Sequence, residues 1–164
     1  MQTHINILFL CTHNSARSIL AEALLNHLGQ GRLRGYSAGS HPRGEPNPLA
    51  LVALSGAGIS TSRLSSKSWD VFATPGAPLM NLVVTVCDNA AGETCPLWPG
   101  GPATVHWGYA DPSAVQGDER QRLDAFIATL ALMRKRVERL VALPDEALAP
   151  SRIGAAARAL ANTE

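Results

Sequence analysis

The chain has little net charge, no long apolar run and few cysteines, and each shortage excludes a class of protein. Lys and Arg number 14 and Asp and Glu number 13, a formal net charge of +1. This balance gives no reason to expect binding to nucleic acid or to an anionic membrane. No apolar run reaches the ~20 residues that cross a bilayer. The first residues carry neither a basic stretch nor a small-residue cleavage site, so we expect a cytosolic protein without a signal peptide.

The chain has 3 cysteines, Cys11, Cys87 and Cys95. An odd number in a reducing compartment argues against a framework of structural disulfides. The thiols are then packing residues, metal ligands or redox groups. A zinc site is the weaker interpretation, because the spacing lacks a C-x2-C pair and no histidine motif accompanies it.

What is present predicts one folded domain. The 164 residues are 46% apolar and 16% charged, which is typical of a globular chain with a sizeable core. Apolar runs and helical periodicity predict strands at 5–10, 34–37, 82–86 and 104–107, and helices at 18–28, 47–54, 67–73 and 119–143. This alternation predicts an α/β fold whose mostly parallel sheet has helices on both faces. We assign the domain to 1–143 and expect an Ala-rich tail at 144–164, loose or partly helical.

Chemically capable side chains follow three of the predicted strands. Cys11 comes directly after the first strand and Cys87 directly after the third, while Asp111 lies a few residues beyond the fourth. In parallel sheets of this kind, ligands bind beyond the carboxyl ends of the strands. We therefore expect these three side chains to gather at one edge of the sheet.

The segment from Cys11 to Ser18 has the pattern C-x5-R-S between a strand and a helix. If it curls, its amides converge beside the helix N-terminus and form a cradle for a tetrahedral oxyanion. Arg17 can grip two of the anion's oxygens, and the same positive field lowers the pKa of Cys11, leaving a nucleophilic thiolate. The alternative is that Cys11 is a small core residue. The expected oxyanion-binding residues are Thr12, His13, Asn14, Ser15, Ala16, Arg17 and Ser18.

This loop, together with "YSAGS" at 36–40 and the pair Asp111-Pro112, resembles the low-molecular-weight protein tyrosine phosphatase superfamily. The resemblance extends to about Leu143. It implies a four-stranded parallel sheet in a three-layer sandwich. It also implies that Cys11 is the nucleophile, that Arg17 binds the oxyanion and that Asp111 is the general acid that protonates the leaving oxygen.

Two further segments are similar to the arsenate reductases within that superfamily: "VTVCDNAAGETCPLWPG" at 84–100 and "HWGYADPS" at 106–113. The resemblance implies that Cys11 attacks arsenate, that Cys87 then attacks Cys11 and releases arsenite, and that Cys95 takes over the disulfide. Arsenic(V) must accept two electrons, and two thiols that become a disulfide supply them. Thioredoxin is the expected external reductant, with glutaredoxin and glutathione as alternatives, and no tightly bound cofactor is expected.

Two other functions stay open. A phosphatase on the same fold would transfer phosphate to Cys11 and release it with water, without Cys87 or Cys95, and some phosphatase activity is expected in either case. A non-catalytic protein that only binds oxyanions is the third hypothesis. In these alternatives Cys87 is a buried thiol at a strand end and Cys95 an incidental surface cysteine.

The resemblance also implies a potassium site beside the loop, formed by Asn14, Glu22, Ser37 and Asp70. Such oxygen donors suit hard cations. The alternatives are that Asn14 holds the shape of the loop and that Glu22 is a solvated helix residue. His13 stands where the related reductases often have Gly, and we expect its side chain to face outward.

Overall fold

The computed structural model describes residues 4–92 and 98–162. Its strands form one sheet in the order β2-β1-β3-β4, and every pair of neighbours is parallel. The strands are β1 (Ile5–Leu10), β2 (Leu33–Ala38), β3 (Leu82–Thr85) and β4 (Ala103–His106). The predicted four-stranded parallel sheet of an α/β fold is confirmed.

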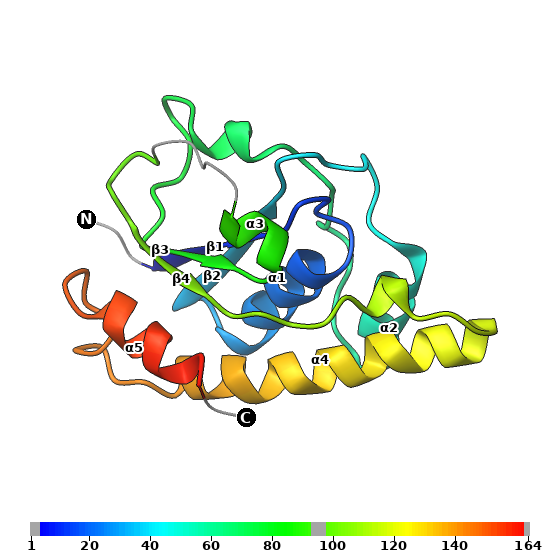
Figure 1. Cartoon of the computed structure of the whole chain (residues 1–164). Helices are drawn as coiled ribbons and strands as arrows, with labels where there is room; N and C mark the ends of the chain where they lie inside the picture. Colours follow the sequence, from blue (N-terminus) through cyan, green and yellow to red (C-terminus); the bar gives the residue numbers. More distant parts are fainter. Residues whose placement is uncertain (1–3, 93–97, 163–164) are drawn as a thin grey trace.

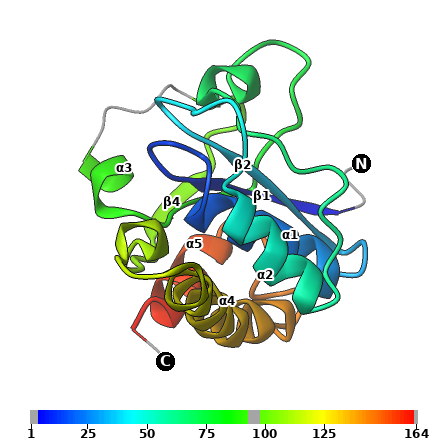
Figure 2. The same cartoon turned by 90° about the vertical axis from the view of Figure 1, so that its right-hand side faces the viewer.

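Helices cover both faces of this sheet, unequally. Figure 2 shows α1, α2, α4 and α5 on one side, and the short 3-10 helix η1 on the other. In Figure 1 the long α4 runs beneath the sheet, with α5 beside its C-terminal part. The helices are α1 (Arg17–Leu28), α2 (Pro48–Gly56), α3 (Asp88–Gly92), α4 (Glu119–Val141) and α5 (Ile153–Leu160), with 3-10 helices η1 (Trp69–Phe72) and η2 (Pro112–Ala114).

The core follows from the two-residue period of the strands. In β1, Ile7 and Phe9 join the cluster beneath α1 and α4, whereas Leu8 and Leu10 join the cluster on the opposite face. All four side chains are fully buried. Because successive strand residues point to opposite faces, a strand buried on both sides is mostly apolar, and the buried polar residue of β1, Asn6, donates through its side-chain amide to the Leu79 carbonyl at 2.9 Å. The run "INILFL" therefore fits the central position of β1.

The helical prediction for 67–73 differs from the structure. Only Trp69–Phe72 is helical there, as a 3-10 turn that begins where the Ser68 hydroxyl accepts a hydrogen bond from the amide of Asp70. A serine cap followed by so short an apolar stretch starts a turn but cannot sustain an α-helix. None of the described helices is both long enough and apolar enough to cross a membrane.

The segment after Leu143 packs against the domain. Leu148, Ile153 and Ala157 are buried in the same cluster as α1 and α4. The indole Nε1 of Trp107, just after β4, donates to the carbonyl oxygen of Ala157 at 2.8 Å. Gly154 lies so close to β4 that an added Cβ would be 2.7 Å from the Cβ of Ala103. The core therefore continues beyond Leu143 into α5. The division into a domain at 1–143 and a tail at 144–164 stays a prediction.

This packing gives a stability test. Replacing the fully buried Ile153 by alanine should lower the free energy of unfolding by about 2–5 kcal/mol, measured by urea denaturation. Arg152→Ala is the matched control, because that exposed side chain makes no capping hydrogen bond, and its effect should stay within about 0.5 kcal/mol. An unchanged midpoint for Ile153→Ala would mean that α5 is a loose appendage.

Candidate active site

The carboxyl ends of β1 and β3 bring two thiols together. Cys11 follows β1 directly, and Cys87 follows β3 after one intervening residue. The two strands are neighbours, and their pairing continues where the Val86 amide donates to the Leu10 carbonyl at 2.9 Å. Both thiols are buried, and neither forms a disulfide within the described residues. The predicted juxtaposition of Cys11 with Cys87 follows from this register.

The loop after Cys11 turns its carbonyl groups outward. The amides of His41, Arg43 and Asn47 donate to the carbonyl oxygens of Thr12, His13 and Ser15, at 2.8, 3.1 and 2.8 Å respectively. Since the N–H and C=O of a trans peptide point in opposite directions, these contacts turn several loop amides toward the interior of the loop. The arrangement is that of an anion-binding nest.

Asn14 fixes the shape of this loop. Its backbone has φ of 46°, in the left-handed region, and its side chain is fully buried. The side-chain Nδ2 donates to the hydroxyls of Ser18 at 2.8 Å and Ser37 at 3.0 Å, while Oδ1 accepts from the amide of Lys67 at 2.9 Å. Asparagine tolerates this backbone conformation better than most residues. The interpretation of Asn14 as a loop-shaping residue is confirmed.

Gly39 lets the end of β2 approach the loop. A Cβ at this position would lie 2.5 Å from the carbonyl oxygen of Thr12 and 2.7 Å from that of Cys11. Backbone atoms at these distances cannot be moved aside without distorting the loop. The glycine in "YSAGS" is thus required by close packing.

Arg17 begins α1 and points toward the segment after β4. Its Nη1 donates to the Tyr109 carbonyl oxygen at 2.9 Å, and its Nη2 lies 3.6 Å from Oδ2 of Asp111. Its Nε is buried and has no hydrogen-bond partner among the described residues. No side chain caps the N-terminus of α1. The loop therefore offers a guanidinium N–H and a positive helix end to an anion.

Asp111 is held by its own turn. Its Oδ1 accepts from the amide and from the hydroxyl of Ser113, at 2.9 and 2.7 Å, and so caps η2. Its side chain is 38% exposed, compared with 15% for Arg17. The carboxylate thus lies at the mouth of the site, beside the arginine, where a leaving group would depart.

Each of the two buried thiols changes the pKa of the other. Their hydrogen bond raises the pKa of Cys11, and burial adds to the effect. The same bond lowers the pKa of Cys87 to about 5, and the amide of Ala90, 3.4 Å from the sulfur, contributes. The sequence predicts a lowered pKa for Cys11 itself, and the structure differs because β3 places a second thiol against the first. The contact between the thiols thus favours the protonated form of Cys11 and the thiolate form of Cys87.

Comparison with known proteins agrees with this geometry. Residues 6–150 match the family model described as low molecular weight phosphotyrosine protein phosphatase. The chain belongs to this phosphatase family. It is 37% identical over 134 residues to a protein named arsenate reductase from Bacillus licheniformis, a match that covers 81% of this chain and 92% of the relative.

Solved structures of arsenate reductases share the fold. An arsenate reductase from Archaeoglobus fulgidus superposes with a TM-score of 0.61 at 27% identity, covering 84% of this chain and 99% of the other. A thioredoxin-dependent arsenate reductase from Corynebacterium glutamicum gives 0.56 at 25% identity, covering 84% of this chain and 63% of the other.

The phosphatase-family loop brings most predicted site residues together. Cys11, Arg17, Cys87 and Asp111 all lie at the carboxyl edge of the sheet, as expected. His13 is exposed and its Nδ1 lies 3.2 Å from the carbonyl oxygen of His41, so its predicted outward orientation is confirmed. Cys95 falls outside the described residues.

The expected potassium ligands only partly converge. Glu22 is buried, and its carboxylate accepts a short hydrogen bond from the Ser37 hydroxyl, so the alternative of a solvated Glu22 is wrong. Asp70 is exposed in η1, and none of its contacts within the described residues reaches this group. Sequence reasoning missed Lys67, whose ammonium lies 3.8 Å from Glu22. No motif marks this lysine.

Proposed function

We propose that this protein is an arsenate reductase that uses a cysteine nucleophile and a disulfide relay. The observation that supports it most is the second buried thiol, Cys87, which lies beside Cys11 where the neighbouring strands β1 and β3 end. Hydrolysis of a phosphate ester needs one nucleophile. A two-electron reduction needs two thiols that can reach each other, and the chain's curated relatives are named arsenate reductases.

In the first step, Cys11 gives its proton to an oxygen of the bound arsenate, and the Cys11 thiolate attacks arsenic. A sulfur–arsenic bond forms and an arsenic–oxygen bond breaks. Asp111 gives a proton to the departing hydroxyl, which leaves as water. Arg17 and the loop amides hold the remaining oxygens, whose negative charge they stabilise throughout the step.

In the second step, Cys87 attacks the sulfur of Cys11. The sulfur–sulfur bond forms and the sulfur–arsenic bond breaks, with its electron pair staying on arsenic, so that arsenite leaves with the negative charge of the Cys87 thiolate. Arsenic has gained two electrons, which the two sulfurs have lost. Cys95 then attacks Cys87, which frees Cys11 and moves the disulfide to the pair Cys87–Cys95.

An external dithiol completes the cycle by reducing that disulfide. Thioredoxin is the proposed donor, supported by the thioredoxin-dependent relative, with glutaredoxin and glutathione as the alternative. A cytosolic location is part of the proposal, because such a relay starts from reduced thiols. Hydrolysis of phosphate monoesters through Cys11 is the expected minor activity, since phosphate and arsenate share shape and charge.

Mass mapping of disulfides tests the reductase directly. After mixing with arsenate in the absence of reductant, the protein should contain a Cys11–Cys87 or a Cys87–Cys95 bridge. The same treatment with phosphate is the control and should leave all three thiols free, because phosphate accepts no electrons from sulfur. Three free thiols after arsenate would instead support the phosphatase.

A further inference from the structure

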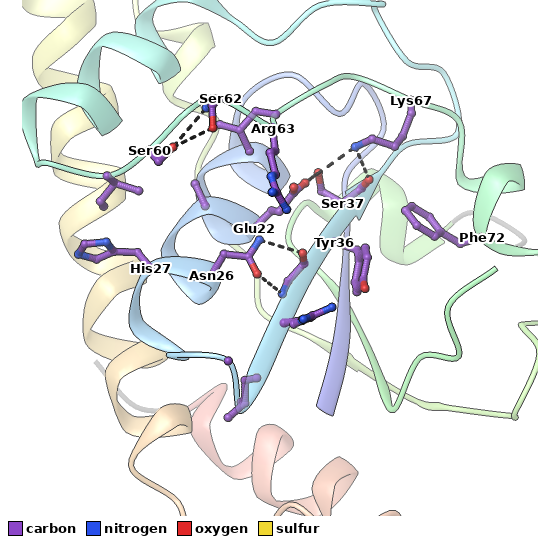
Figure 3. A pocket seen from close by; sticks show the side chains of 17 residues that line it. Glu22, Asn26, His27, Tyr36, Ser37, Ser60, Ser62, Arg63, Lys67 and Phe72 are labelled. Atoms are coloured by element: carbon purple, nitrogen blue, oxygen red, sulfur yellow. Dashed lines mark hydrogen bonds and ion pairs between the residues drawn. The ribbon is translucent and has the colours of Figure 1, made fainter. Parts of the chain in front are cut away.

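The ammonium group of Lys67 lies among oxygen atoms directly behind the oxyanion loop. Its Nζ donates to the carbonyl oxygens of Ser65 at 2.7 Å and Ser37 at 2.9 Å, and it lies 3.8 Å from Oε1 of Glu22. Figure 3 shows Lys67 reaching toward Ser37 and Glu22 at one end of a pocket of about 720 Å³ that runs along β2. These contacts hold the long side chain of Lys67 in one position.

The backbone around Lys67 holds the side chain there. Gly39 and Ser68 form a short parallel bridge. Within it, the amide of Gly39 donates to the Lys67 carbonyl at 3.0 Å and the amide of Trp69 donates to the Gly39 carbonyl at 2.9 Å. The amide of Lys67 itself donates to Oδ1 of Asn14 at 2.9 Å. Lys67 is therefore attached to the loop through its backbone amide, and its ammonium group is attached to β2 and α1 through Ser37 and Glu22.

This arrangement does not fit the potassium site that the sequence predicts. The Oδ1 of Asn14 already accepts from an amide, and the Ser37 hydroxyl donates to Glu22. Asp70 takes no part. The Lys67 ammonium already donates to the Ser37 carbonyl and lies 3.8 Å from Glu22, so a potassium ion bound to these oxygens would meet a positive charge at short range.

The buried carboxylate of Glu22 explains why a positive charge is needed behind the loop. Glu22 is only 8% exposed. Burial raises the pKa of its carboxyl, while the Ser37 hydrogen bond and the Lys67 charge oppose that rise. An uncompensated carboxylate behind the loop would repel the oxyanion that the loop binds, and would be costly to bury. A positive charge beside Glu22 removes both penalties.

We propose that Lys67 is a built-in counter-cation that replaces potassium behind the oxyanion loop, so that this protein binds oxyanions without any requirement for potassium. Lys67 is a positioning residue, because it acts through Asn14, Ser37 and Glu22 and not on the substrate. The proposal concerns anion binding and holds whether the bound anion is then reduced or hydrolysed.

Calorimetric titration with inorganic phosphate tests this independently of turnover. The buffers contain either potassium chloride or choline chloride at equal ionic strength. The wild-type protein should bind phosphate with the same Kd in both buffers, within about twofold. Lys67→Ala should bind roughly tenfold more weakly in choline and recover most of that loss in potassium, because removing the side chain uncovers the oxygen donors.

Two further variants control the experiment. Lys135→Ala removes a lysine that is exposed on α4 and should match the wild type in both buffers. Lys67→Met keeps the length of the side chain without its charge, so it should bind phosphate weakly whether or not potassium is present, and it is the decisive variant if Lys67→Ala does not fold. Thermal unfolding should show the same pattern, with potassium raising the Tm of Lys67→Ala only.

Three results would each overturn the proposal. One is a wild-type Kd that improves more than about threefold in potassium. Another is wild-type phosphate affinity in Lys67→Met. The third is a loss of affinity in Lys67→Ala that potassium does not reverse.

Discussion

Cys87→Ser should abolish arsenate reduction while leaving hydrolysis of an aryl phosphate in place. Without the second thiol, the adduct between Cys11 and arsenic has no intramolecular route to a disulfide, so we expect turnover coupled to a thioredoxin system to fall by at least about a thousandfold. Phosphate transfer to Cys11 does not use Cys87. The serine side chain of this variant keeps a hydrogen-bonding group beside Cys11, so hydrolysis should be unchanged.

The matched control is Cys11→Ser, which should lose both activities because it removes the nucleophile. Far-ultraviolet circular dichroism and the urea midpoint of both variants establish that the fold is kept. The relay through Cys87 is wrong if Cys87→Ser reduces arsenate at the wild-type rate. Loss of both activities in a folded Cys87→Ser would mean that Cys87 serves Cys11 as a base and not as the second reductant.

The sheet and the nucleophile could be predicted from sequence because both depend on local patterns. The apolar run before Cys11 identifies a strand buried on both faces, and the C-x5-R-S spacing places Arg17 at the start of a helix. The closeness of Cys87 follows from the adjacency of β1 and β3. Chain order alone does not give that adjacency, because β2 lies between these strands in sequence but on the other side of β1 in the sheet.

The charge state of the thiols could not be predicted from the loop alone. The loop supplies a positive field that favours a thiolate at Cys11. The hydrogen bond between the two sulfurs depends on how β3 pairs with β1, and this bond moves the negative charge to Cys87. A pairwise contact between segments that lie 76 positions apart has no signature in either segment's own sequence.

The role of Lys67 and the close packing of α5, a helix that the sequence only allowed, were missed for different physical reasons. Lys67 lies in an irregular segment, where no periodicity shows which way a side chain points. The Ala-rich residues of α5 carry a weak apolar signal, yet small side chains let that helix approach β4 closely, as the contact of Gly154 with Ala103 shows. Arg136 lies over the rings of both Trp107 and Tyr109, so this packing reaches the segment that leads to Asp111.

Substitution of Arg17 should cause the second large loss of activity, because this side chain lies between the bound anion and the carboxyl group of Asp111. Its guanidinium has a buried Nε without a partner among the described residues, and its other nitrogens reach the Tyr109 carbonyl and the Asp111 carboxylate. Arg17→Lys should therefore lower kcat/KM for arsenate reduction and for aryl phosphate hydrolysis alike, by about a hundredfold to a thousandfold. Lysine keeps the charge but cannot hold two oxygens and a carbonyl with one planar group.

The matched control is Arg120→Ala, which removes an exposed arginine whose only recorded partner in the described chain is Asp124, one helical turn away. Both activities should then stay within about twofold of the wild type, because surface ion pairs of this kind contribute little. Near-normal turnover in Arg17→Lys would show that charge alone suffices. An effect on reduction without an effect on hydrolysis would place Arg17 outside the shared anion-binding step, and the loop would then need another group to grip the oxyanion.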